Sequence, residues 1–82
     1  MSAKQNLIFF TLREGDEFIP LIQLLKATGL IYSGSEAQEA VAAGMVTRNG
    51  EVELRKRAKI RAGETIVFQN VTIRVEYDAS VE

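Results

Sequence analysis

Residues 33–61 read SGSEAQEAVAAGMVTRNGEVELRKRAKIR, and this stretch decides the fold. It opens with a pattern that predicts a helix over residues 34–43. Ser33 and Glu36 form a capping box, in which the serine oxygen accepts from a first-turn amide and the glutamate returns to the cap amide. Small residues then recur at helical spacing and give a smooth face for a neighbouring element. These residues are Ala37, Ala40, Val41 and Gly44, the last of which suits the left-handed conformation that ends a helix.

A tight hairpin and a run of cations follow the helix. Asn49-Gly50 favours positive φ at both central residues of a type I′ turn, so residues 45–48 and 52–54 are its predicted arms. Directly after the second arm come five cations in seven residues, and we refer to residues 55–61 as the basic segment. Its cations are Arg55, Lys56, Arg57, Lys59 and Arg61.

The segment before residue 33 predicts a strand and a helix. In the apolar run 7–12, Ile8, Phe10 and Leu12 share one face of a strand, and a charged turn follows at residues 13–17. Pro20 suits the first position of a helix. The apolar stripe of that helix, Leu21, Leu24 and Leu25 with Thr28 a turn on, ends at Gly29. We expect this stripe to pack against the alanine face of the second helix.

The segment after residue 61 predicts two more strands. Residues 62–64 form a turn, residues 65–68 a strand, and Gln69-Asn70 turns the chain again. Residues 71–77 alternate between apolar and polar side chains, as expected of a half-buried strand. The predicted fold class is α+β, with two packed helices against a small, mostly antiparallel sheet.

Length and composition indicate one small domain spanning residues 1–82. The chain has 82 residues, 46% of them hydrophobic, and no cysteine, so its core must hold without disulfides. Residues 1–6 and 79–82 are polar ends that we expect to be loose. No secretory signal is visible, and no apolar run approaches the length of a membrane span. A monomer in the cytoplasm, with no membrane partner, is the expectation.

Charge is concentrated in the basic segment, although the net charge of the chain is only −1. The basic segment carries +5, whereas residues 1–54 and residues 62–82 each carry −3. A polyanion would therefore meet one local patch and not a uniformly basic surface. A run of charge is often only a solvated face, but this run contains no acidic residue. Phosphate binding by its guanidinium and ammonium groups is the favoured interpretation.

The side chains offer little for catalysis. The chain has no histidine and no cysteine, which removes most nucleophile-base pairs and transition-metal sites, and no phosphate-binding glycine loop is present. The acidic clusters are expected to be solvated in turns and hairpin arms. These clusters are Glu14, Asp16 and Glu17, and Glu51 with Glu53. We predict a protein that is not an enzyme and needs no cofactor or metal.

Six aromatic residues are present, and most fit core positions, so a base-stacking sheet is not expected. Recognition of structured RNA by shape and backbone is the more consistent mode. Tyr32, just before the second helix, is the aromatic residue that could contact RNA, although packing is the favoured interpretation.

The order Ser-Gly-x-x-Ala, Gly-x-Val, Asn-Gly and then a basic run resembles the S-four RNA-binding domain, the αL motif named after ribosomal protein four of the small subunit. The phrase ELRKRAK at residues 53–59 is similar to the stand-alone YbcJ-like branch of bacterial proteins. The resemblance covers residues 18–68.

The resemblance implies that RNA lies across the start of the second helix and the hairpin that follows. The contacts that it implies are Ser33, Ser35, Gln38, Asn49, Arg55, Lys56, Arg57 and Lys59. We add the flanking cations Arg48 and Arg61 as candidate RNA contacts. Three residues depart from the family pattern. Gln38 stands where a cation is usual, Arg48 where an apolar residue is usual, and Ser35 where the branch has glycine. We expect the stem of Arg48 to lie on the core edge and its head to reach solvent.

Three functions remain open at this point. The first is a small RNA-binding protein that contacts structured ribosomal RNA or assembling ribosomes, as the resemblance implies. The second is an adaptor whose basic segment docks on an acidic protein surface. The third, a more distant one, is an accessory subunit with no chemical role of its own. Lys26, late in the first helix, is either a surface residue or an additional phosphate contact.

Overall fold

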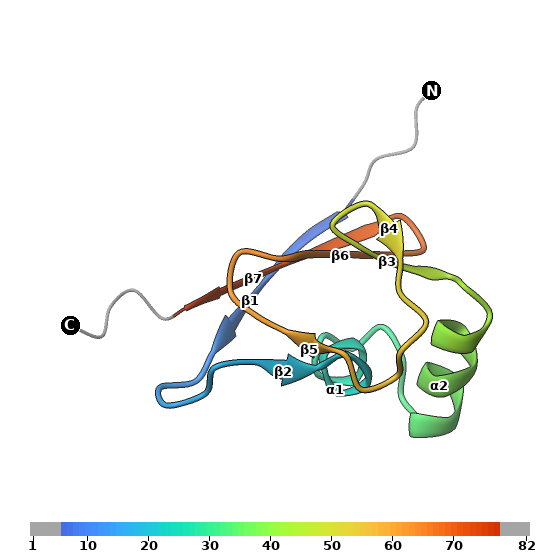
Figure 1. Ribbon diagram of the computed structural model, residues 1–82, viewed down its shortest axis with the longest axis horizontal. Coiled ribbons are helices and arrows are strands. Elements are labelled where there is room, and N and C mark those ends of the chain that lie inside the picture. The colour runs from blue at the N-terminus through green and yellow to red at the C-terminus, as the bar shows by residue number, and fades with distance from the viewer. Residues whose placement is uncertain (1–5, 78–82) are drawn as a thin grey trace.

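The structure is a computed structural model that describes residues 6–77, and these form two helices and two sheets. In Figure 1 the larger sheet lies above the helices α1 and α2, and β2 and β5 form a short ribbon near α1. The elements are β1 (Asn6–Leu12), β2 (Ile19–Pro20), α1 (Leu21–Ala27), α2 (Gly34–Ala42), β3 (Val46–Arg48), β4 (Glu51–Val52), β5 (Lys59–Ile60), β6 (Thr65–Phe68) and β7 (Val71–Tyr77). The predicted α+β class is confirmed.

The larger sheet has five strands in the order β1-β7-β6-β3-β4. Its pairs are antiparallel except β1 with β7, which run parallel, so the sheet is mixed but mostly antiparallel. The alternation predicted for β7 is present: Val71, Ile73 and Val75 are buried, whereas Arg74 and Glu76 on the other face are exposed. One face of the sheet thus covers the core.

The core forms where α1 and α2 meet under this sheet. Leu21, Leu24 and Leu25 are fully buried, and they share one apolar cluster with Ala37, Ala40 and Val41 of α2. This confirms the predicted packing of the leucine stripe on the small-residue face. Because the α2 face carries short side chains, the two helices can approach closely.

The helix ends follow the predicted signals with one correction. Ser33 caps α2, because its Oγ accepts from the amide of Glu36 at 3.1 Å. Gly44 follows α2 with a φ of +77°, the left-handed conformation expected after a helix end. Pro20 is not the first helical residue: its ψ of 143° is extended, so it precedes α1 as the cap and pairs in β2.

Both predicted hairpin turns are present, and Asn49-Gly50 has the expected conformation. Asn49 and Gly50 have φ values of 52° and 89°, which connect β3 to β4. Gln69 and Asn70 likewise have positive φ, and they connect β6 to β7. The prediction of loose ends falls outside the described residues except at Asn6, which begins β1.

Candidate nucleic-acid interface

The basic segment alternates between core and surface. Ala58 is 5% exposed and Ile60 is fully buried, so this part of the chain belongs to the core. Arg57, Lys59 and Arg61, which flank these two residues, therefore point outward. All five cations of the segment are exposed: Arg55, Lys56, Arg57, Lys59 and Arg61. The predicted patch of cations is thus exposed because apolar neighbours anchor it.

The backbone of the basic segment also caps α1. The amide of Leu21 donates to the carbonyl of Ala58 at 2.9 Å, and that of Ile22 donates to the carbonyl of Lys56 at 3.3 Å. First-turn amides of a helix have no partner within the helix, so these carbonyls supply one. The basic segment therefore sits on the N-terminal end of α1.

Arg48 lies beside the basic segment, and its head, which we expected to reach solvent, is only partly exposed. Its side chain is 20% exposed and bonds to two carboxylates. Nη1 donates to Glu53 at 3.2 Å, while Nε and Nη2 donate to Glu64 at 3.1 and 3.0 Å. Arg48 is thus engaged in hydrogen bonds within the protein. We call Arg48, Glu53, Arg55 and Glu64 the Arg48 network.

Glu53 was expected in solvent, and it is instead 8% exposed. The apolar residues on either side, Val52 and Leu54, are exposed, so the alternation here places the carboxylate inward. Its pKa is lowered to about 2, chiefly by the hydrogen bond from the Arg55 side chain, with further bonds from the Arg55 amide and Arg48 outweighing burial. Glu53 is therefore a structural anion and not a general acid.

Glu64 holds the other end of the basic segment. Its Oε1 accepts from the amide of Arg61 at 2.8 Å, and its Oε2 accepts from the side chain of Asn49 at 3.3 Å. Burial acts to raise the pKa of Glu64, but the bonds from Arg61, Arg48 and Asn49 lower it overall. Asn49 also accepts from the amide of Thr65, so this predicted RNA contact has a structural role in the hairpin.

Arg55 is partly neutralised by Glu53. Its Nε lies 3.0 Å from Glu53 Oε2, and this hydrogen bond raises the pKa of Arg55 above its usual value. Glu53, which lies outside the basic segment, thus compensates part of the positive charge of the segment. The sequence of the segment, which contains no acidic residue, did not show this. Within residues 6–77, the other four cations form no salt bridge. These four are Lys56, Arg57, Lys59 and Arg61.

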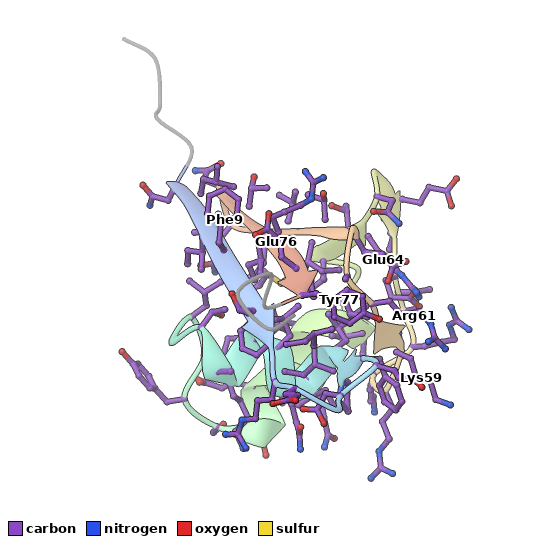
Figure 2. All side chains as sticks on the ribbon, turned by 90° about the vertical axis from the view of Figure 1, so that its left-hand side faces the viewer. Phe9, Lys59, Arg61, Glu64, Glu76 and Tyr77 are labelled. Atoms are coloured by element: carbon purple, nitrogen blue, oxygen red, sulfur yellow. The ribbon has the colours of Figure 1, made fainter. Side chains whose placement is uncertain are left out.

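Phe18 lies under two of these four cations. The Lys59 ammonium is 5.1 Å and the Arg61 guanidinium 5.9 Å from the centre of its ring, within the range of cation–π contact. Figure 2 shows Lys59 and Arg61 together on one side of the molecule with Glu64 above them, far from Phe9. The position of Phe18 did not follow from the sequence, because it contacts cations more than 40 residues away. Nor did that of Glu64, which bonds to Arg48 across 16 residues.

The start of α2 is the second half of the predicted interface. Ser33 is used as the cap, whereas Ser35 and Gln38 are exposed on the helix. Tyr32 is 87% exposed, so it does not pack in the core of this chain. No side-chain hydrogen bond within residues 6–77 joins this region to the basic segment; α1 lies against both.

Exposed aromatic residues are more numerous than expected, but they do not form one platform. Phe9 is 58% and Tyr77 60% exposed. Phe9 pairs with Arg74 on the outer face of the sheet, whereas Tyr77 follows the core-facing positions of β7. The two rings therefore lie on opposite faces and cannot stack neighbouring bases as a sheet platform requires.

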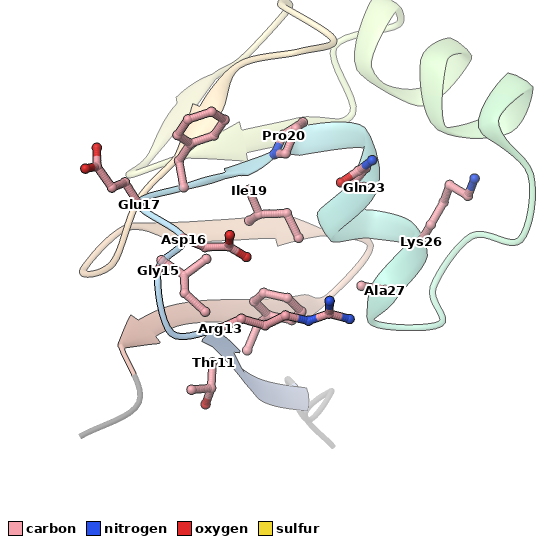
Figure 3. A pocket seen from close by; sticks show the side chains of 13 residues that line it. Thr11, Arg13, Gly15, Asp16, Glu17, Ile19, Pro20, Gln23, Lys26 and Ala27 are labelled. Atoms are coloured by element: carbon pink, nitrogen blue, oxygen red, sulfur yellow. The ribbon is translucent and has the colours of Figure 1, made fainter. Parts of the chain in front are cut away.

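A groove of about 980 Å³ lies between α1 and the turn after β1. In Figure 3 one side carries Asp16 and Glu17 and the other carries Gln23 and Lys26. Arg13 and Lys26 balance the two carboxylates, so the lining offers no net positive charge to a phosphate backbone. The described residues contain no cluster of three or more His, Cys, Asp or Glu side chains suited to a metal ion. Nor does residue range 6–77 include a helix long and apolar enough to cross a membrane.

Comparison with known proteins gives a consistent picture. Residues 10–76 match the family model of the S4 domain. YbcJ of Escherichia coli (strain K12), named as a candidate RNA-binding protein, is 44% identical over 57 residues, which are 70% of this chain and 81% of YbcJ. The tyrosine–tRNA ligase of Nitrosospira multiformis is 38% identical over 58 residues, which are 71% of this chain but only 14% of the ligase.

The fold of a solved relative agrees as well. The solution structure of E. coli YbcJ, described as revealing an αL motif involved in RNA binding, superposes with a TM-score of 0.67. It is 37% identical in sequence, and the match covers 93% of this chain and 95% of that one. Sequence, family model and fold agree, and the chain belongs to the S4 domain family.

Proposed function

We propose that this chain is a non-enzymatic RNA-binding protein that holds the backbone of structured RNA with its basic segment and the start of α2. The observation that carries the proposal is the set of four exposed cations without a salt bridge among the described residues: Lys56, Arg57, Lys59 and Arg61. Alternation with buried Ala58 and Ile60 directs Arg57, Lys59 and Arg61 outward. The description of E. coli YbcJ supports RNA as the polyanion.

Structured RNA fits this surface better than single strands do. Cations on an irregular segment bind phosphate oxygens, whereas recognition of single strands usually relies on neighbouring exposed rings. The exposed rings here lie on different faces, as described above. Within this proposal the partner is ribosomal RNA or an assembling ribosomal particle in the cytoplasm of a bacterium. The S4 family membership makes ribosomal RNA fragments the first RNAs to test.

A salt titration tests the proposal. Affinity for a folded ribosomal RNA fragment, measured by fluorescence anisotropy, should fall with salt with a log–log slope of roughly −3 to −4, since each phosphate contact contributes about −0.7 to −0.9. The double variant Lys56→Gln/Arg57→Gln should lose roughly 1.5 to 2 of that slope. An unstructured RNA of equal length should bind more weakly.

A control of equal charge makes the titration specific. Arg13→Gln/Arg74→Gln removes two exposed cations outside the basic segment and should leave the slope nearly unchanged. Equal losses in both double variants would mean that only net charge matters. Absence of any RNA affinity, with a protein partner that survives nuclease treatment in a pull-down, would instead support an adaptor.

A further inference from the structure

Arg48 bonds to three separate points around the basic segment. Besides Glu53 and Glu64, its Nη2 donates to the backbone carbonyl of Lys59 at 2.9 Å. One guanidinium therefore links Glu53, just before the basic segment, Lys59 within the segment, and Glu64, just after it. The planar fork of arginine allows such multiple fixed bonds, which the single ammonium of lysine cannot reproduce.

The two carboxylates in turn hold the ends of the basic segment by its backbone. Glu53 accepts from the amide of Arg55 at 3.0 Å, and Glu64 accepts from the amide of Arg61 at 2.8 Å. These are the first and last residues of the basic segment. Arg48 bridges the two carboxylates, so it connects both ends of the segment through them.

We propose that Arg48 is a positioning residue for RNA binding, which fixes the shape of the basic segment and does not itself contact phosphate. This inference rests on the proposed function. Four of its five N–H donors bond to Glu53, Glu64 and the Lys59 carbonyl, and its side chain is only 20% exposed. The network holds the segment in one conformation, so the exposed cations do not have to be ordered when RNA binds.

The proposal predicts an effect of opposite sign from simple electrostatics. Glu64→Ala removes a negative charge beside a basic surface, and charge alone would make RNA binding tighter. If the Arg48 network positions the segment, the same variant should bind roughly 3- to 10-fold more weakly, because fewer molecules hold the competent conformation. Arg48→Lys keeps the charge and should weaken binding to a similar extent without changing the salt slope.

Glu51→Ala is the matched control. Glu51 is an exposed glutamate in β4, opposite Arg48 across the hairpin, and it makes no side-chain hydrogen bond within the described residues. Its removal takes away the same charge without disturbing the network, so RNA binding should be unchanged or slightly tighter. Two results would overturn the proposal. One is that Glu64→Ala has the same RNA affinity as Glu51→Ala, and the other is that Arg48→Lys has the same RNA affinity as the unmodified protein.

Amide hydrogen exchange measured without RNA separates this inference from the proposed function. Glu64→Ala and Arg48→Lys should speed exchange at the amide of Arg61, and Arg48→Lys also at that of Arg55, while amides of β6 and β7 keep their protection. Unchanged exchange at both sites would refute the positioning role whether or not RNA binds. Faster exchange in a protein that binds no RNA would support the network as a structural element but would reject its role in RNA binding.

Discussion

At the residue scale, a carboxylate between two arginines couples the basic segment to pH. Glu53 is buried among Arg48 and Arg55, and its pKa is lowered to about 2. Between pH 2 and 4.5 the unfolded chain therefore binds more protons at this site than the folded chain does. It follows that stability from Glu53 is fully present above about pH 4.5 and is lost as pH falls through about 2.

Glu53→Gln should thus remove much of the acid sensitivity of folding. We expect the unmodified protein to lose about 1 to 3 kcal/mol from this site between pH 5 and pH 2. One pKa unit corresponds to about 1.4 kcal/mol, and solvent around the exposed Arg55 reduces the full amount. The variant should be less stable at pH 6 but show a flatter pH profile. Urea unfolding at a series of pH values measures this. Parallel profiles of stability against pH for the two proteins would contradict this prediction. Glu51→Gln, which changes an exposed glutamate, is the control.

Tyr32 is the second residue whose environment suggests a test. It is 87% exposed and directly precedes Ser33, so its removal should not disturb the core. If its ring stacks on RNA, Tyr32→Ala should weaken binding by about 1 kcal/mol or more, the usual range for a base on an aromatic side chain. Thermal unfolding should be unchanged. Tyr77→Ala, which removes a similarly exposed ring, should leave anisotropy titrations unaltered.

At the element scale, the two serines at the start of α2 have different roles. Ser33 accepts a hydrogen bond from the amide of Glu36, whereas Ser35 is exposed within the first turn. Ser33→Ala should cost about 1 kcal/mol of stability through loss of the cap. Ser35→Ala should not lower stability, but it should weaken RNA binding if this helix end receives a phosphate.

Chemical denaturation and RNA titration of both variants distinguish these roles. The expected result is a change in unfolding midpoint for Ser33→Ala alone and a change in affinity for Ser35→Ala. Unaltered affinity in Ser35→Ala would confine the interface to the basic segment. Gln38, exposed on the same helix, offers a further check: Gln38→Lys should tighten binding if RNA lies along α2.

At the scale of the whole molecule, local patterns predicted both helices and the strands of the larger sheet. They predicted neither the short strands β2 and β5 nor the contacts between distant elements. The cap at Ser33, the turn at Asn49-Gly50 and the strand at residues 65–68 carry their signals within a few residues, and all are present. The Arg48 network joins residues up to 16 positions apart, so neither the burial of Glu53 nor the engagement of Arg48 was visible. The parallel pairing of β1 with β7 was likewise not specified.

The basic segment is also part of the global core, which leads to a last prediction. Ile60 is fully buried between cations and pairs with Ile19 of β2, so the candidate interface cannot unfold separately without exposing core surface. Ile60→Ala should cost about 2 to 5 kcal/mol, as for other large-to-small core changes. That is a large share of the roughly 4 to 12 kcal/mol expected for a domain of this size.

Because the cations themselves remain in Ile60→Ala, the salt slope of RNA binding by the folded fraction should not change. Urea unfolding combined with anisotropy at low temperature measures both quantities, and a stable variant with a reduced slope would show that the segment is a peripheral loop independent of the core.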